Sequence, residues 1–270
     1  MLTNKILNFP HKAILTREVL QEIYKYPREF FRLIYSDYAD GIICGLNYFI
    51  DEEKNLNLSP GMILSGGEIY FLEESVNVSE LAEKNNLTDG RDYYIFPQKE
   101  SQKKSPCLTE NKLVLTFGEE DKNFSLGKFR FKSKNDFNLP TLSNNENPFE
   151  NIFRPSTFDL FDVPYADKGE ATFHPQLFEP VKNFLASKEN KTPLDYSILT
   201  HLQNHEIISL QTIEYYIAEQ NSEDTFENRK ELFQTFCDCL LTSEFKIKVV
   251  QIEDDHDEPL KSFRGKGRRI

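Results

Sequence analysis

Two histidines placed four residues apart, His201 and His205, have the clearest spacing for metal chemistry in the chain. Side chains at positions i and i+4 of a helix share one face, so the two imidazoles could bind one divalent cation. A zinc-peptidase helix also needs a glutamate beside its first histidine as general base, and Leu202 stands there. We therefore interpret the pair as two half-exposed helical histidines, and we predict no metal site and no cofactor.

Carboxylates gather in two places along the chain. Asp159, Asp162 and Asp167 lie within the segment FDLFDVPYAD, but their spacing matches no paired-carboxylate mechanism. The aromatic residues beside them suggest a loop packed on a domain surface. Residues 253–258, EDDHDE, could attract cations but lack the glycine and the terminal glutamate of an EF-hand loop. Neither cluster predicts a catalytic site.

The remaining candidates for chemistry are the cysteines and the nucleotide-binding motifs. Cys237 and Cys239 lie two residues apart in a helical pattern, where their side chains face different directions. We predict buried thiols there, not a disulfide or a metal site. The sequence contains no P-loop, no dinucleotide-binding glycine motif and no GxSxG nucleophile elbow. We predict that the chain is not an enzyme.

The elements that would position these residues begin with two short helices between residues 16 and 38. Thr16 is a suitable N-cap for the first helix. Pro27 suits the first position of the second helix. This second helix carries Phe30, Phe31 and Ile34, so it is apolar enough to be buried on more than one side.

Short strands are predicted next. The run GIICGLNYFI at 41–50 has strand length, and Pro60-Gly61 and Gly66-Gly67 are turn signals around further strands. More strands, each alternating or rich in aromatic residues, are expected at 93–96, 112–117 and 128–132. Short strands separated by turns favour a small sandwich or barrel over a parallel α/β sheet.

The C-terminal half has a helical pattern. Residues 136–150 are rich in Asn, Ser and Pro, which is typical of a linker. Three or four helices are predicted between 174 and 241, one of them opened by Thr192 as N-cap, Pro193 in the first turn and Asp195 near the positive end of the helix dipole. A last strand is expected at 245–250.

The composition excludes some partners. The 270 residues include 44 acidic and 32 basic side chains, a net charge of −12, which argues against a nucleic-acid-binding surface except at the basic end of the tail, residues 261–270. No stretch approaches the roughly 20 apolar residues that span a bilayer. The N-terminal segment lacks the apolar region of a signal peptide. We expect cytoplasmic synthesis and no membrane insertion.

Together these patterns predict an α+β protein with four parts. Residues 1–135 form a helix-led β-rich module, a small sandwich or barrel. Residues 136–150 form an Asn/Pro-rich linker, and residues 151–252 form a mostly helical domain. Residues 253–270 form a charged tail.

The stretch from Leu15 to Leu72 resembles a module of phage tail and baseplate proteins and of contractile injection particles. In such modules a helix leads into a glycine-containing strand, a polar strand and a hairpin. The matching residues are Asp40, Gly41, Ile42, Ile43, Gly45, Leu46, Pro60, Gly61, Gly67, Tyr70 and Leu72. These glycines would also shape turns in any small β domain. The resemblance implies a non-catalytic structural subunit of a phage-tail-like or contractile injection baseplate, assembled into a virion or injection particle. Its partners would be copies of itself or other baseplate or tail subunits.

Contacts with such partners are expected where apolar residues lie on otherwise polar segments. These places are the helix at 30–35, the edges of the β module, the segment 149–165 and the charged tail. The candidate interface residues are Phe30, Phe31, Ile34, Tyr35, Phe153, Phe158, Phe161, Tyr165, Arg264, Arg268 and Arg269.

Two other functions stay open. A regulatory adaptor would hold a small molecule or glycan in its β module, and a ligand-induced rise in melting temperature would favour it. A hydrolase would use unrecognised carboxylates or a metal bound by His201 and His205. Metal analysis and an activity panel on the His201→Ala, His205→Ala double variant would test that function.

Overall fold

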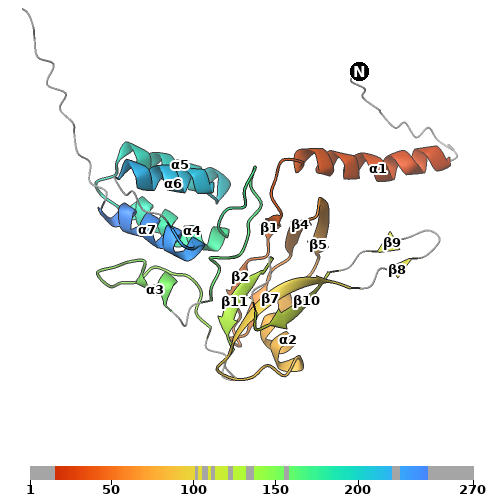
Figure 1. Ribbon diagram of the computed structural model, residues 1–270, viewed down its shortest axis with the longest axis horizontal. Helices are drawn as coiled ribbons and strands as arrows, with labels where there is room; N and C mark the ends of the chain where they lie inside the picture. Colours follow the sequence, from red (N-terminus) through yellow and green to blue (C-terminus); the bar gives the residue numbers. More distant parts are fainter. Residues whose placement is uncertain are drawn as a thin grey trace, which may run out of the picture.

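The computed structural model describes residues 16–100, 103–104, 109–110, 113–120, 124–131, 137–154, 158–220 and 226–242. Strands dominate the N-terminal half and helices the C-terminal half, which confirms the predicted α+β class. In Figure 1 the helices of the C-terminal half stack on one side of the molecule and the strands lie on the other. The first helix projects away from both.

The described strands form three antiparallel sheets of three strands and one two-stranded ribbon. The first sheet has the order β1-β4-β5 and contains β1 (Gly41–Gly45), β4 (Gly61–Ser65) and β5 (Glu68–Leu72). The second has the order β2-β3-β6 and contains β2 (Tyr48–Ile50), β3 (Leu56–Leu58) and β6 (Val76–Asn77), which leads into α2 (Val78–Lys84). The third has the order β10-β7-β11 and contains β7 (Asp92–Lys99), β10 (Leu113–Gly118) and β11 (Gly127–Arg130). The ribbon pairs β8 (Lys103–Lys104) with β9 (Thr109–Glu110). These described strands form no closed barrel, so the barrel alternative is wrong.

Glycines shape both ends of the first sheet. Gly66 and Gly67 join β4 to β5 with φ values of +59° and +74°. Positive φ at both positions is what the common two-residue hairpin turn requires. At the other end Gly45 also has a positive φ, and a Cβ atom there would lie 2.1 Å from the carbonyl oxygen of Pro60. The close approach of β1 to β4 therefore needs a residue without a side chain.

The helices of the C-terminal half are α3 (Glu150–Phe153), α4 (Pro175–Ser187), α5 (Pro193–His205), α6 (Leu210–Glu219) and α7 (Arg229–Thr242). The predicted cap of α5 is confirmed. Thr192 Oγ1 accepts a hydrogen bond from the Asp195 amide, and Asp195 Oδ2 accepts one from the Thr192 amide. The fully buried Asp195 also accepts from Lys188 Nζ at 2.9 Å and from Tyr216 Oη at 2.6 Å. One carboxylate thus joins the end of α4 to α5 and α6.

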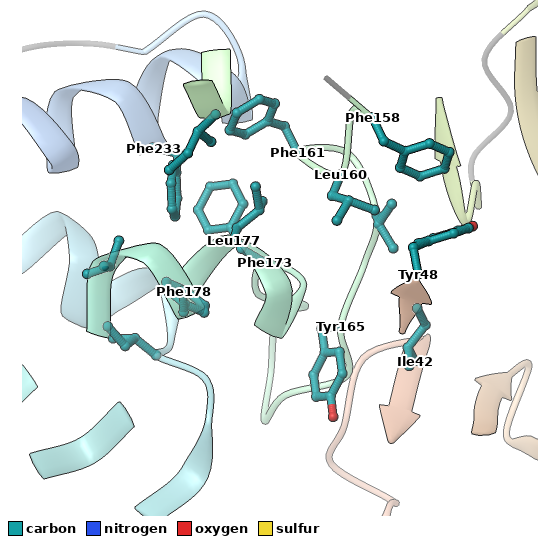
Figure 2. Packing of buried hydrophobic residues seen from close by; sticks show 14 of the residues in the cluster. Ile42, Tyr48, Phe158, Leu160, Phe161, Tyr165, Phe173, Leu177, Phe178 and Phe233 are labelled. Carbon is teal, nitrogen blue, oxygen red and sulfur yellow. The ribbon is translucent and has the colours of Figure 1, made fainter. Parts of the chain in front are cut away.

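Both halves of the chain contribute to one hydrophobic core. Figure 2 shows Phe161, Phe173 and Phe233 gathered near the helices, and Phe158 beside Tyr48 of β2. The ring centroids of Tyr48 and Phe158 are 4.2 Å apart. The halves are therefore not separate packing units.

The predicted linker belongs to the same core in its described part, residues 137–150. Phe149 is fully buried, and the carbonyl of Asn138 accepts a hydrogen bond from the Phe158 amide at 2.7 Å. The linker prediction is corrected accordingly, because this segment is a packed connection and not a spacer.

Polar contacts also join the halves. The Gln176 side chain donates from Nε2 to the Tyr48 carbonyl and accepts at Oε1 from the Tyr48 amide, both at 2.7 Å. His174 is fully buried and accepts at Nδ1 from the Gln176 amide, so its Nε2 carries the proton and donates to the Leu46 carbonyl at 3.3 Å. Burial lowers the pKa of His174 to about 4. The ring is therefore neutral near pH 7.

The two short helices predicted between 16 and 38 are one helix, α1 (Arg17–Ile34), with Pro27 inside it. Proline has no N–H, so the carbonyl of Ile23 loses its usual donor four residues on. Because this part of α1 is exposed, water can bond the Ile23 carbonyl in place of the missing N–H. The helix therefore continues through Pro27. The strand expected at 245–250 and the charged tail lie outside the described residues.

Candidate protein-interaction surface

The helix α1 has an apolar side and a polar side. Thr16 caps it, accepting at Oγ1 from the Val19 amide at 3.4 Å. Apolar residues recur every three or four positions, which places them on one side of a helix. These residues are Val19, Leu20, Ile23, Tyr24, Tyr26, Pro27, Phe30, Phe31, Leu33 and Ile34. The opposite side carries Gln21, Lys25, Arg28, Glu29 and Arg32.

The apolar side of α1 is largely uncovered. Eight of its large apolar side chains are between 38% and 69% exposed, with Phe31 the most covered and Leu33 the least. Figure 1 shows the reason, because α1 projects from the molecule and lies near β1 only at its C-terminal end. An apolar patch of this extent is typical of a surface that binds protein.

A groove separates α1 from the β4–β5 hairpin and has a volume of about 1060 Å³. Its apolar lining comes from both walls and includes Tyr24, Phe31, Tyr35, Leu64, Ile69 and Phe71. Phe71 is 63% exposed on β5, which is an edge strand of its sheet. Charged residues at the groove are Arg28, Glu29, Arg32, Asp40 and Glu68. An apolar centre with a charged rim is the usual composition of a protein interface.

One ion pair crosses from α1 to the hairpin. Arg28 Nη2 lies 3.1 Å from Glu68 Oε1, and Arg28 Nη1 donates to Tyr24 Oη at 3.1 Å. The other carboxylate oxygen of Glu68 accepts from Tyr70 Oη at 3.2 Å. The Arg28 and Glu68 side chains are both exposed, so the pair orients the groove walls but contributes little free energy.

The residues after α1 fix the direction in which the helix leaves the molecule. The Ala39 amide donates to the Asp167 carbonyl at 3.0 Å, and the Gly169 amide donates to the Asp37 carbonyl at 2.8 Å. Asp40 Oδ2 accepts from the Gly66 amide at 2.8 Å, which ties the connection to the hairpin turn. The base of α1 is thus anchored, while its apolar side stays open.

Two ionisable groups near the end of α1, Tyr35 and Cys44, have raised pKa values. Burial raises the pKa of the Tyr35 phenol, and the charges of Cys44 and Tyr38 act in the same direction. Burial also raises the pKa of the Cys44 thiol, against a smaller opposite effect of a hydrogen bond from the Met62 backbone. Both shifts favour the protonated form of the group.

Four predicted interface residues lie on or beside α1. Phe30, Phe31 and Ile34 are exposed, and Tyr35 is half-buried at the end of the helix. The structure thus leaves the three helix residues accessible to a partner, and their role as contacts stays a prediction.

Three others, Phe158, Phe161 and Tyr165, lie in the core instead, and the partner role of the half-buried Phe153 stays a prediction. Phe158, Phe161 and Tyr165 are buried, and the half-buried Phe153 stacks on Phe161 with ring centroids 5.5 Å apart. Figure 2 shows Phe158 beside Tyr48 and Phe161 near Phe173 and Phe233. The expectation that Phe158, Phe161 and Tyr165 contact a partner is corrected, because the same chain already covers them. Phe161, for example, meets Phe233 of α7 at 5.8 Å.

The last three candidates, Arg264, Arg268 and Arg269, lie outside the described residues. So does the acidic block at 253–258.

Of the residues singled out for catalysis or metal binding, His201 and His205 lie side by side, as their spacing predicts. His201 and His205 are exposed on α5, with ring centroids 4.8 Å apart. Within the described ranges no group of three or more His, Cys, Asp or Glu residues could hold a metal ion. Asp159 accepts at Oδ1 from the Phe161 amide and so shapes its own turn. Cys237 and Cys239 are buried, as predicted.

Sequence reasoning missed half of the apolar surface of α1. The prediction began at Phe30, whereas the exposed side also includes Leu20, Ile23 and Tyr26. The signal was present in the three- and four-residue spacing from 20 to 34. Dividing the segment at Pro27 hid it, because each half alone is too short to show a continuous stripe.

None of the described helices combines the length and the apolarity needed to cross a membrane. Comparison with protein-family models, curated proteins and solved structures gave no match to this chain. Its function therefore has to be argued from its own residues.

Proposed function

We propose that this protein is a non-catalytic structural subunit of a phage-tail-like or contractile injection baseplate, and that it binds neighbouring subunits through α1 and the β4–β5 hairpin. The observation that carries the proposal is the uncovered apolar side of α1, with eight exposed large side chains on one helix.

An isolated helix of this kind needs a partner. Most of the stability of helices in proteins comes from packing an apolar side against another element. The body of the molecule covers little of that side in α1. A neighbouring protein that covered it would stabilise the helix and remove apolar surface from water at about 25 cal/mol per Å².

The resemblance to baseplate modules supports the class of assembly. The residues that carry it build the platform of α1, because Gly41, Gly45 and Gly61 lie in β1 and β4 while Asp40 bonds the hairpin turn. The platform and the helix that it holds form a single module. In that module the helix is the part offered to a neighbour.

The test is co-sedimentation of the purified chain with baseplate and tail subunits encoded beside it. Tyr26→Glu should lower the bound fraction at least tenfold, because it places a charge in the apolar side of α1. Tyr196→Glu on α5 is the matched control, since Tyr26 and Tyr196 are both 57% exposed. Equal binding by both variants, or no binding by the unaltered chain, would contradict the proposal.

A regulatory adaptor is the second candidate, favoured by the size of the groove. A volume of about 1060 Å³ with aromatic walls is just above the range of about 300–1,000 Å³ that is usual for ligand sites. A panel of small molecules and glycans would then include one that raises the melting temperature of the unaltered chain but not of Phe71→Lys. No rise with any compound would count against this candidate.

A further inference from the structure

The interaction surface has a convex part and a concave part side by side. The convex part is the apolar side of α1, which includes Leu20, Ile23 and Phe30. The concave part is the groove between α1 and β5. A surface that carries both a ridge and a groove can pair with a copy of itself, because a two-fold axis places each ridge in the other groove.

The size of the groove fits a helix. A helix is about 10 Å across and rises about 5.4 Å per turn, so two turns occupy roughly 850 Å³. The groove, at about 1060 Å³, is comparable in volume to about two turns of helix with their side chains. The 18 residues of α1 form about five turns, enough to fill the groove and extend past it.

We infer that α1 of a second copy of this chain occupies the groove, so that two copies form an antiparallel, two-fold dimer. Across the interface the order is β5 of the first copy, α1 of the second, α1 of the first and β5 of the second. This inference rests on the proposed function, since it names one partner for the same surface.

The buried area favours insertion over simple pairing of the two helices. A helix about 27 Å long presents an apolar half of roughly 400 Å². Two helices packed only on each other would bury about 800 Å² in total, the size of a crystal contact. Insertion adds the hairpin walls, which include Ile69 and Phe71, and moves the total toward the roughly 1,200 Å² of a stable interface.

The charges around the groove permit two copies to meet. A chain with a net charge of −12 would be repelled by its copy if an acidic face were buried. The groove instead carries charges of both signs, because Arg28 and Arg32 lie beside its acidic side chains. Insertion separates Arg28 from Glu68 of the same chain. Both side chains are exposed, so losing this pair costs the dimer little free energy.

Analytical ultracentrifugation of the full chain over a range of concentrations tests the dimer. Phe30→Glu alters the inserted helix and Phe71→Lys alters the groove. Each should raise the dimer dissociation constant roughly 30-fold or more, the change typical of a lost hot-spot side chain. Tyr196→Glu should sediment like the unaltered chain. Far-ultraviolet circular dichroism shows that each variant folds, and both altered side chains are exposed in the monomer.

Mixing the two variants separates insertion from helix pairing. In a heterodimer, the unaltered helix of the Phe71→Lys chain enters the unaltered groove of the Phe30→Glu chain. At the second site, the carboxylate introduced at position 30 faces the ammonium group introduced at position 71. We expect the mixture to form heterodimers more tightly than either variant forms homodimers. A groove variant that dimerises like the unaltered chain, or a mixture that shows no rescue, would overturn the inference.

The two proposals fail in different ways. A chain that stays monomeric at its highest soluble concentration but binds baseplate subunits through Tyr26 overturns the dimer and supports the proposed function. A dimer that depends on Phe30 and Phe71 in a chain that binds no such subunit supports the inference and overturns the baseplate assignment.

Discussion

Helices α1 and α7 carry the same kinds of side chain and differ in what covers them. On α7, Phe233 and Phe236 are fully buried, and Phe233 packs against Phe173 with ring centroids 5.0 Å apart. On α1, the rings of Phe30 and Phe31 lie 6.0 Å apart and both are exposed. An apolar pattern thus determines which side of a helix must be covered. Whether the cover comes from the same chain depends on the neighbouring elements.

Arginine residues show the same contrast. Arg229 of α7 donates from Nε to the Phe161 carbonyl at 3.0 Å and from Nη1 to the Ala171 carbonyl at 3.1 Å. Arg28 of α1 instead contacts the side chains of Tyr24 and Glu68 at an exposed site. The arginine of α7 holds a loop to the core, whereas that of α1 joins two exposed elements at the rim of the groove.

The largest expected effect comes from removing one ring in each region. Phe233→Ala should lower the free energy of unfolding by about 3–5 kcal/mol, because it leaves a cavity in the core. Phe30→Ala should lower it by about 0.5 kcal/mol or less in dilute monomer, because the ring is already exposed. Urea unfolding at pH 7 measures both values.

Repeating the unfolding measurement at high dilution is the control for this pair of variants, because dilution removes any cover that a second copy supplies. If Phe30→Ala costs as much as Phe233→Ala even at high dilution, α1 is covered within one chain and the contrast between the two helices is wrong.

The next effect concerns pH and the connection between the halves. His174 has a pKa of about 4 in the folded protein and about 6.5 in the unfolded chain. Below pH 6.5 the unfolded chain binds the extra proton, so the free energy of unfolding falls as the pH drops from 6.5 toward 4. Between pH 7 and pH 5 the loss should be about 2 kcal/mol.

Urea unfolding of the unaltered chain and of His174→Asn at both pH values checks this assignment. Asparagine can still accept from the Gln176 amide but does not titrate, so its loss between pH 7 and pH 5 should be much smaller. A variant that keeps the full loss would assign the pH dependence to other groups. Helix α1 contains no histidine, so this pH effect belongs to the connection between the halves.

The smallest effect compares two helix caps. Thr192→Ala should lower the free energy of unfolding by about 1 kcal/mol, because it removes the cap of a helix packed in the core. Thr16→Ala removes the same kind of bond from α1 but should change global stability by less than about 0.5 kcal/mol. Its effect should appear as faster amide hydrogen exchange at the start of α1. Equal global losses would show that α1 unfolds with the core.

Local chemistry made much of the fold predictable. The cap formed by Thr192 and Asp195 follows from side-chain hydrogen bonding to nearby amides, and the Gly66-Gly67 hairpin follows from its need for positive φ. Both depend on residues close together in the chain. The strands predicted at 93–96, 112–117 and 128–132 correspond to β7, β10 and β11. They could be predicted because alternation and aromatic content are also local features of the sequence.

Long-range packing was not predictable in the same way. Pro27 was expected to divide α1, but solvent exposure lets the helix continue through it. Phe158 and Phe161 were expected at the surface, because nothing local indicates that Tyr48 and Phe233 would cover them. For the candidate site, the apolar residues of α1 were partly predicted. The groove was not, because it needs the hairpin and the helix in one structure.

The two hydrogen bonds between Gln176 and Tyr48 limit where this chain can be cut into fragments. The side-chain carboxamide of Gln176 bonds both the N–H and the carbonyl of Tyr48 at the outer edge of β2. Another strand could otherwise add to the sheet at this edge. A fragment that stops before α4 would leave that edge open, beside the apolar Ile50 and Phe49. Expression of the first half alone should therefore give inclusion bodies, and the unit to clone for any reconstitution includes α4.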